Sequence, residues 1–161
     1  VAIDGAAQTG HNGIAGEVGH LPLPRMTPDE YPGRRCWCGR HGCLEVFISG
    51  TGFRADYVDA TGEDISTKDI IANMRAGDAK AKASFDRYCD RLARSLSMVA
   101  EMIDPDAFVL GGGMSNVDEI YTAVPPLLAA TALTDTMTTP ILKAVHGDSS
   151  GVRGAAWLWG R

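Results

Sequence analysis

The sequence lacks two features that would point at once to a membrane or to a nucleic acid. No apolar run in its 161 residues approaches the roughly 20 residues of a membrane-spanning helix. It also has no block of Lys and Arg: 15 basic and 20 acidic side chains give a formal charge of −5. Nucleic-acid binders rely on basic side chains that neutralise phosphates. We therefore expect this protein to bind neither a membrane nor a nucleic acid. The start of the chain has no charged segment followed by an apolar one, so it lacks a secretory signal, which predicts the cytoplasm.

Aromatic residues are also few, at 7% of the chain, but the total apolar content is sufficient for a core. Hydrophobic residues make up 45% and charged residues 22%, which is unlike the composition of disordered chains. A length of 161 residues is that of one domain. The sequence therefore predicts a globular fold.

Cysteine is scarce, with four residues, and three of the four lie close together. Cys36, Cys38 and Cys43 fall within one short segment, whereas Cys89 stands apart. In a reducing compartment, such a cluster indicates a metal site rather than disulfides. Cys89 belongs to an apolar pattern with helical spacing, so we expect it to be a small buried side chain.

Glycine, proline and apolar spacing divide the chain into short strands and helices. An Asp-Gly pair predicts a hairpin at the start, and a glycine-rich loop and a proline-punctuated excursion follow it. Further along, short apolar runs alternate with helical patterns, which indicates an α/β fold with helices packed on a sheet. The expected helices are 44–60 with a break at 49–52, 67–77, 79–103, 117–133 with a break or kink near its two prolines, and 150–159; the expected later strands are 107–110 and 141–145.

The cysteine cluster and one nearby histidine fit a structural zinc site. The thiolates of Cys36, Cys38 and Cys43 and the imidazole of His20 make a closed tetrahedral set of four ligands. Such a set leaves no open position on the metal for an activated water. Zinc would order the proline-rich excursion, which has little core of its own. His41 lies inside the cluster and is a rival fourth ligand that spacing alone does not exclude.

Two glutamates flank the expected metal. Glu17 lies in the glycine-rich loop three residues before His20, and Glu45 follows Cys43 by two residues. Carboxylates held in this way can accept hydrogen bonds from the neighbouring hydroxyls of a sugar. Glu45 has an equally simple structural interpretation, because a negative side chain is favourable in the first turn of a helix.

Five segments resemble the ROK family of repressors, open reading frames and sugar kinases. The resemblance covers nearly the whole chain, and in detail it is most like the fructokinases of that family. It rests on the spacing of glycines, cysteines and glutamates in segments 13–20, 36–45, 48–50, 109–116 and 146–156.

The resemblance implies an actin-like, hexokinase-type (ribonuclease H-like) α/β fold with a zinc-stabilised loop, in an enzyme that transfers a phosphoryl group from ATP to a hexose. It implies that Glu17, His20 and Glu45 contact the sugar, that His20 also binds zinc, and that Gly111, Gly112 and Gly113 approach the nucleotide. It further implies Mg²⁺ as a cofactor, fructose as the hexose and a homodimer. From the residues alone, the three glycines equally suit a tight turn without a ligand.

The sequence departs from the family pattern in what it does not contain. The Asp-x-Gly-x-Thr phosphate loop, the catalytic aspartate and the second phosphate loop of such kinases are missing. We therefore expect residues 1–161 to be a C-terminal lobe, with a zinc-binding insertion at about 20–45, that is inactive alone and has its catalytic aspartate upstream. The alternatives are a sugar-responsive repressor with an upstream helix-turn-helix and a stand-alone zinc-stabilised binding module.

Overall fold

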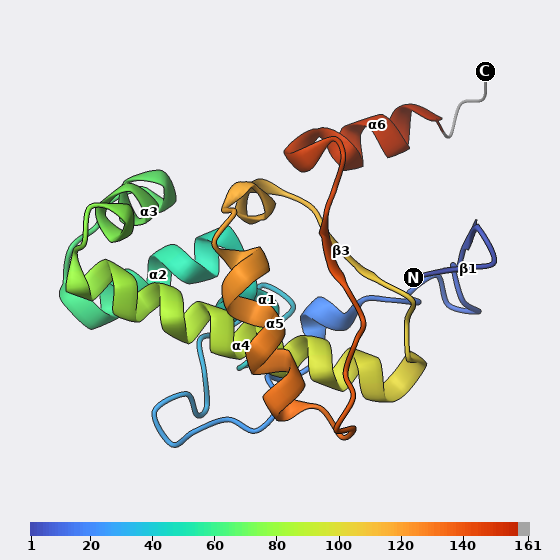
Figure 1. The fold of residues 1–161 in the computed structure, drawn as a ribbon, viewed down its shortest axis with the longest axis horizontal. Helices are drawn as coiled ribbons and strands as arrows, with labels where there is room; N and C mark the ends of the chain where they lie inside the picture. The colour runs from blue at the N-terminus through green and yellow to red at the C-terminus, as the bar shows by residue number, and fades with distance from the viewer. Residues whose placement is uncertain (158–161) are drawn as a thin grey trace.

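A computed structural model describes residues 1–157 and contains helices, short strands and 3-10 turns in alternation (Figure 1). The long helix α4 is its centre. The helices are α1 Glu45–Ile48, α2 Gly50–Thr61, α3 Thr67–Arg75, α4 Ala79–Ile103, α5 Ile120–Thr131 and α6 Ser150–Trp157; the strands are β1 Ala2–Ile3, β2 Ala6–Ala7, β3 Phe108–Leu110 and β4 Ile141–Lys143; the 3-10 turns are η1 Val18–His20, η2 Gly113–Asn116 and η3 Gly147–Ser149.

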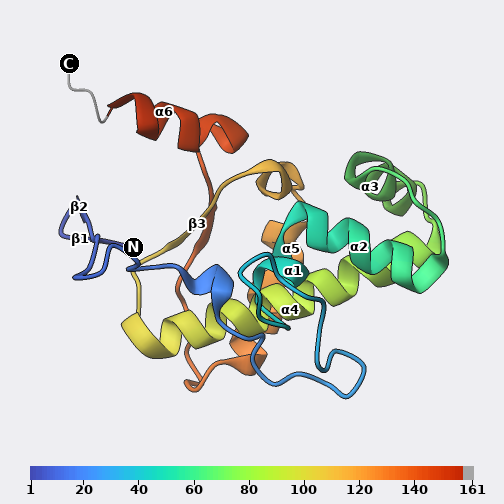
Figure 2. The same cartoon turned by 180° about the vertical axis from the view of Figure 1, so that it is seen from behind.

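Helix α4 runs through the molecule with α5 on one side and α1 and α2 on the other, as the two opposite views show (Figures 1 and 2). Its buried residues include Phe85, Cys89 and Leu92, which confirms the predicted apolar face and the buried Cys89. Ile103 is 47% exposed, because it is the last residue of the helix and lies beyond the core. No helix among residues 1–157 is both long enough and apolar enough to span a membrane.

The helix boundaries follow local sequence signals. Ser66 and Asp78 cap α3 and α4, since each side chain accepts a hydrogen bond from the backbone three residues later. The predicted break in 44–60 is confirmed at Ser49, whose extended backbone separates α1 from α2 and whose hydroxyl accepts from the Gly52 amide. Gly62 ends α2 in the left-handed conformation, with φ of 74°.

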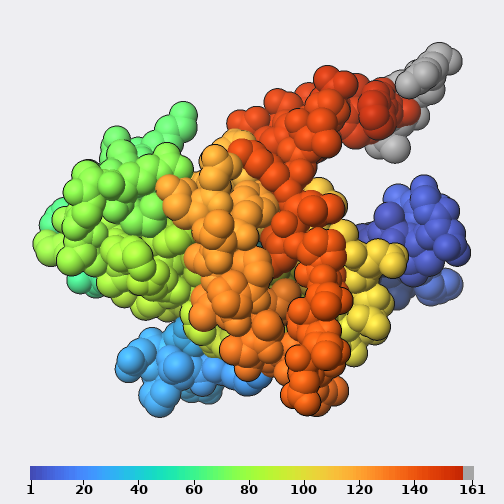
Figure 3. All heavy atoms as spheres, viewed as in Figure 1, coloured from blue at the N-terminus to red at the C-terminus, as the bar shows by residue number. Residues whose placement is uncertain are grey.

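The strands pair in two small sheets. β1 and β2 form the predicted hairpin, with Asp4 and Gly5 at positive φ, and β3 pairs in parallel with β4, which ends at Lys143 rather than at 145. In the space-filling view the hairpin and α6 project from the body (Figure 3). The expected closing helix 150–159 is confirmed to Trp157, and its last two positions lie outside the described residues.

The predicted helix 117–133 is shorter than expected and is not broken. It starts at Ile120 and continues through Pro125 and Pro126 to its end at Thr131. Its buried face, which includes Val124 and Leu128, packs on α4. This burial offsets the two backbone hydrogen bonds that the prolines cannot donate.

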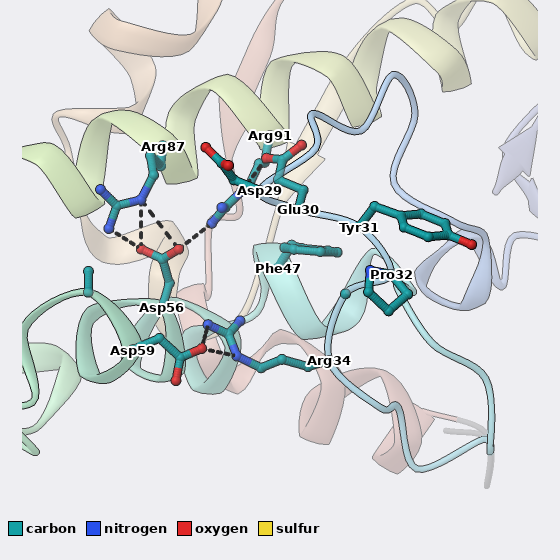
Figure 4. Close-up of a pocket in the computed structure, with 12 residues that line it drawn as sticks. Asp29, Glu30, Tyr31, Pro32, Arg34, Phe47, Asp56, Asp59, Arg87 and Arg91 are labelled. Carbon is teal, nitrogen blue, oxygen red and sulfur yellow. Dashed lines mark hydrogen bonds and ion pairs between the residues drawn. The ribbon is translucent and has the colours of Figure 1, made fainter.

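A buried cluster of charges fastens the excursion to α4 (Figure 4). Glu30, at the tip of the excursion, accepts hydrogen bonds of 2.8 Å from Arg91 Nε and 2.7 Å from Arg94 Nη2. Arg91 also donates to Asp56 of α2, at 2.6 Å. Arg94 donates to the carbonyl oxygens of Pro24 and Arg25, so the excursion is attached to α4 at residues 24–25 as well as at Glu30. We call Glu30, Asp56, Arg91 and Arg94 the charge cluster.

Charge pairing outweighs the penalty of burial in this cluster. Burial alone would raise the pKa of Glu30, but hydrogen bonds from Arg94 and Arg91 lower that pKa from 4.5 to about 2. Because the pKa is lower in the folded state, the resulting stability is fully present above pH 4.5 and is lost as the pH falls toward 2.

Replacing Glu30 with Gln in the full-length protein tests this cluster. We expect the free energy of unfolding at pH 7 to fall by about 3 kcal/mol, because two guanidinium groups lose a buried partner. The pH dependence of stability below pH 4.5 should become shallower. Denaturant unfolding followed by circular dichroism measures both, with the exposed Glu101→Gln as control. Equal stability of Glu30→Gln and wild type at pH 7 would contradict the expectation.

Candidate functional site

The structure brings the four predicted metal ligands together. The side chains of His20, Cys36, Cys38 and Cys43 each offer one ligand atom, and these atoms all lie within 4.8 Å of one another. Cys36 Sγ lies 3.6 Å from His20 Nδ1, and Cys38 Sγ lies 3.6 Å from Cys43 Sγ. In a tetrahedral zinc site with Zn–S bonds of about 2.3 Å, neighbouring ligand sulfurs are about 3.7 Å apart. The donor set and its spacing therefore fit zinc.

Backbone pairing places the cysteines opposite η1. Leu23 donates its amide to the Gly42 carbonyl, and Leu44 donates to the Leu21 carbonyl, so the segment after His20 runs beside the last cysteine. Gly42 has φ of +71°, and a Cβ there would lie 2.5 Å from Met26 Cε and 2.8 Å from the Pro32 carbonyl oxygen. Only glycine fits this position.

His41 does not join the cluster. Its side chain is exposed, and its Nδ1 lies 3.1 Å from the carbonyl oxygen of Gly33. It is also outside the group of ligand atoms that gather around His20. Of the two histidines left open by spacing, the geometry therefore favours His20.

The thiol of Cys43 resists ionisation. Burial, together with the hydrogen bonds and charges of Cys38 and Cys36, raises the pKa of Cys43 to about 12. A metal must therefore displace a proton from this thiol, since the thiolate is the ligand. Metal binding should consequently strengthen as the pH rises.

A hollow of about 770 Å³ opens beside the cluster. Glu17 and His20 supply polar groups to it, and Ile14, Trp37 and Met102 supply exposed apolar ones. We call it the His20 hollow. The sequence predicted two of these residues, whereas the three apolar residues and Arg40, which also lines the hollow, were not predicted.

Glu45 lies at the edge of this arrangement, at the start of α1. Its Oε2 is 3.7 Å from His20 Nδ1 and 2.9 Å from Trp37 Nε1, which donates to it. His20 therefore links the metal cluster, the His20 hollow and Glu45. The arrangement offers carboxylate acceptors and an imidazole beside apolar walls, which is the chemistry that a polyhydroxylated ligand with apolar faces requires.

Gly111, Gly112 and Gly113 line a different hollow of about 320 Å³, together with Gly50 and Met114. A Cβ at any of the three would meet no atom within 4 Å, so their small size leaves this surface open rather than filled by protein. The structure thus places the predicted nucleotide residues where a ligand could approach the backbone.

A further hollow of about 540 Å³ lies over the charge cluster (Figure 4). Apart from Asp29, the charged groups that line it are already paired: Asp56 with Arg87 and Arg91, Glu30 with Arg91, and Arg34 with Asp59. A ligand would have to replace these short ion pairs. We therefore assign this hollow a structural role.

Comparisons with known proteins agree on one family. A sequence model described as "ROK family" matches residues 1–161. An N-acetyl-D-glucosamine kinase of Pectobacterium carotovorum subsp. carotovorum (strain PC1) is 44% identical over 162 residues, covering 98% of this chain and 53% of that protein. The chain spans about half the length of the curated relatives it matches.

Solved structures confirm the fold. A ROK hexokinase from Thermus thermophilus matches with a TM-score of 0.81 and 28% identity over 97% of this chain and 51% of that one. A ROK family glucokinase from Streptomyces griseus, in complex with glucose and AMPPNP, matches with a TM-score of 0.82 and 28% identity over 97% of this chain and 55% of that one. The predicted actin-like, hexokinase-type α/β fold class is therefore correct.

Replacing Cys38 with Ser tests the metal cluster. We expect zinc in the full-length protein to fall from about one to near zero per chain, because one of four ligands is lost. Mobility should increase mainly over residues 35–43, since the charge cluster still holds the excursion near Glu30.

Elemental analysis and amide hydrogen exchange make these measurements. The control is Cys89→Ala, which changes a buried cysteine of α4 outside the cluster. This variant should bind as much zinc as the wild type. Zinc retained at the wild-type level in Cys38→Ser would contradict the expected ligand set.

Proposed function

The chain belongs to the ROK family, and on that basis we propose that it is the sugar-binding lobe of a kinase that transfers the γ-phosphoryl group of ATP to a hexose. The observation that carries the proposal is the position of Glu17, His20 and Glu45 around one cluster of candidate metal ligands: Glu17 and His20 line the His20 hollow, and Glu45 Oε2 lies 3.7 Å from His20 Nδ1. The names of the matched relatives and of the glucokinase with bound glucose and AMPPNP support it.

In this proposal each residue has a distinct role. The carboxylates of Glu17 and Glu45 accept hydrogen bonds from sugar hydroxyls, while His20 binds the sugar through its free ring nitrogen and the metal through Nδ1. Accepting from several hydroxyls fixes the orientation of the ring, and orientation is a large part of phosphoryl-transfer catalysis.

The other predicted components complete the reaction. Gly111, Gly112 and Gly113 leave room for the nucleotide. Zinc held by His20 and the three cysteines is structural, and Mg²⁺ with ATP supplies charge neutralisation and the phosphoryl group. The group that accepts the proton of the attacking hydroxyl is an aspartate outside these 161 residues. A homodimer and a cytoplasmic location are further parts of the proposal.

The identity of the sugar is the finer part of the proposal. The resemblance to the fructokinases of the family predicted fructose, whereas the matched relatives are named N-acetyl-D-glucosamine kinases. The His20 hollow has exposed apolar side chains in Ile14, Trp37 and Met102, which suit the methyl group of an N-acetyl substituent. We therefore place N-acetyl-D-glucosamine before fructose.

A coupled ADP-release assay on the zinc-loaded full-length protein tests the function. The reactions contain ATP and Mg²⁺ with N-acetyl-D-glucosamine, fructose, mannose, glucose or no sugar. Sugar-dependent turnover is the expected result, and the ranking of kcat/KM values identifies the preferred sugar. Folded protein without turnover on any of these sugars would contradict the kinase and favour the sugar-responsive repressor.

Replacing Glu17 with Gln in the full-length protein tests the sugar contacts. We expect kcat/KM for the sugar to fall about tenfold or more, because a charged acceptor of hydroxyl hydrogen bonds becomes neutral. Zinc content and the KM for ATP should not change. Glu63→Gln, an exposed carboxyl paired with Lys80 on α4, serves as control. Wild-type sugar kinetics in Glu17→Gln would remove Glu17 from the site.

A further inference from the structure

Trp37 is the most unusual side chain beside the His20 hollow. It lies between two of the metal-ligating cysteines and is 79% exposed. An exposed indole gains little from burial, so its pose must be fixed by specific contacts. Two such contacts are present, one to each of two residues assigned to sugar binding.

The first contact is a hydrogen bond. Trp37 Nε1 donates to Glu45 Oε2 at 2.9 Å, which is the ordinary length of a strong N–H···O bond. The second contact is aromatic: the Trp37 and His20 rings meet edge to face, with centroids 4.8 Å apart and an interplanar angle of 82°. The indole therefore contacts Glu45 and His20 at the same time.

The position of Glu45 explains why a donor is needed there. Its Oε2 lies 3.8 Å from Cys36 Sγ and 3.7 Å from His20 Nδ1. With zinc bound, three thiolates and a neutral imidazole leave the cluster with one net negative charge, which repels a carboxylate at this distance. The Glu45 side chain is 42% exposed and would turn away into water if nothing held it.

The hydrogen bond from Trp37 counteracts this repulsion and leaves the second oxygen available. Among residues 1–157, the Glu45 carboxylate accepts its hydrogen bonds at Oε2, while Oε1 has no protein donor. A carboxylate fixed by one oxygen can accept a substrate hydroxyl with the other at a smaller loss of side-chain entropy.

From these contacts we infer that Trp37 is a positioning residue for sugar binding: its N–H holds the Glu45 carboxylate beside the negative metal cluster and leaves Oε1 to accept a substrate hydroxyl. The inference rests on the proposed function, because it takes Glu45 as a sugar ligand. It gives Trp37, a residue of the cysteine segment, a role in sugar binding that depends on its contact with Glu45 and not on binding the metal or stabilising the fold.

The decisive variant is Trp37→Phe, which keeps an aromatic ring near His20 and removes the Nε1–H donor together with one ring of the indole. In the full-length zinc-loaded protein we expect the Kd for the sugar, measured by calorimetry without ATP, to rise about tenfold. The KM for the sugar should rise in parallel, while zinc content and the KM for ATP stay at wild-type values. The matched control is Tyr31→Phe, an exposed aromatic of the same excursion, which should leave sugar binding unchanged.

A double-mutant cycle separates positioning from a general effect on the site. If Trp37 acts through Glu45, Trp37→Phe should change the sugar Kd less than twofold when Glu45 is already Ala. Monodeoxy sugars provide an independent readout, because the effect of Trp37→Phe should vanish for the analogue that lacks the hydroxyl bound by Glu45.

Each contrary result has a distinct meaning. Wild-type sugar affinity in Trp37→Phe, or an undiminished effect in the Glu45→Ala background, would overturn the role of Trp37 and leave the kinase intact. Loss of zinc from Trp37→Phe would also overturn it, since the indole would then support the metal cluster itself. A wild-type protein that binds no sugar would overturn the proposed function and this inference together.

Discussion

The pairing of Glu30 with Arg91 and Arg94 is the interaction on which the arrangement of the site depends. The excursion between His20 and Cys43 buries only a few side chains, so it has little core to hold it. At its tip the buried ion pairs join it to α4 at 2.8 and 2.7 Å, and at its base the candidate metal ligands Cys36, Cys38 and Cys43 gather beside His20 of η1. The two attachments use unlike chemistry, so the loss of one leaves the other in place.

This arrangement explains how a loop rich in proline and glycine can carry binding residues. Helix α4 is anchored by its apolar face against α2 and α5. Its arginines extend from this fixed element to the excursion, and the excursion in turn places Cys36 beside His20. Glu45 belongs to α1, which also packs on α4. The Glu45 carboxylate and the cysteine segment are therefore positioned by one rigid helix, whereas Glu17 belongs to the glycine-rich loop that precedes η1.

Much of the fold was predictable because its signals are local. The Asp-Gly pair predicted the hairpin, the segment 49–52 predicted the break between α1 and α2, and the apolar spacing around Cys89 predicted the buried face of α4. The charge cluster was not predictable, because Arg91 resembles an ordinary polar residue until Glu30, 61 positions earlier, is placed against it. The candidate ligand set was predicted from cysteine spacing, whereas the preference for His20 over His41 needed the geometry. The contact of Trp37 with Glu45 likewise depends on a side-chain direction that spacing does not contain.

Gly33 and Gly42 of the excursion lie so close together that neither position has room for a larger residue. A Cβ on Gly33 would lie 2.6 Å from the Cα of Gly42, and a Cβ on Gly42 would meet Met26 and the Pro32 carbonyl. Both have positive φ, so neither steric room nor backbone conformation allows another residue. A change at one cannot be rescued by a change at the other, since both are already at minimal size. Substitutions in this part of the excursion should therefore be tolerated mainly at its exposed side chains.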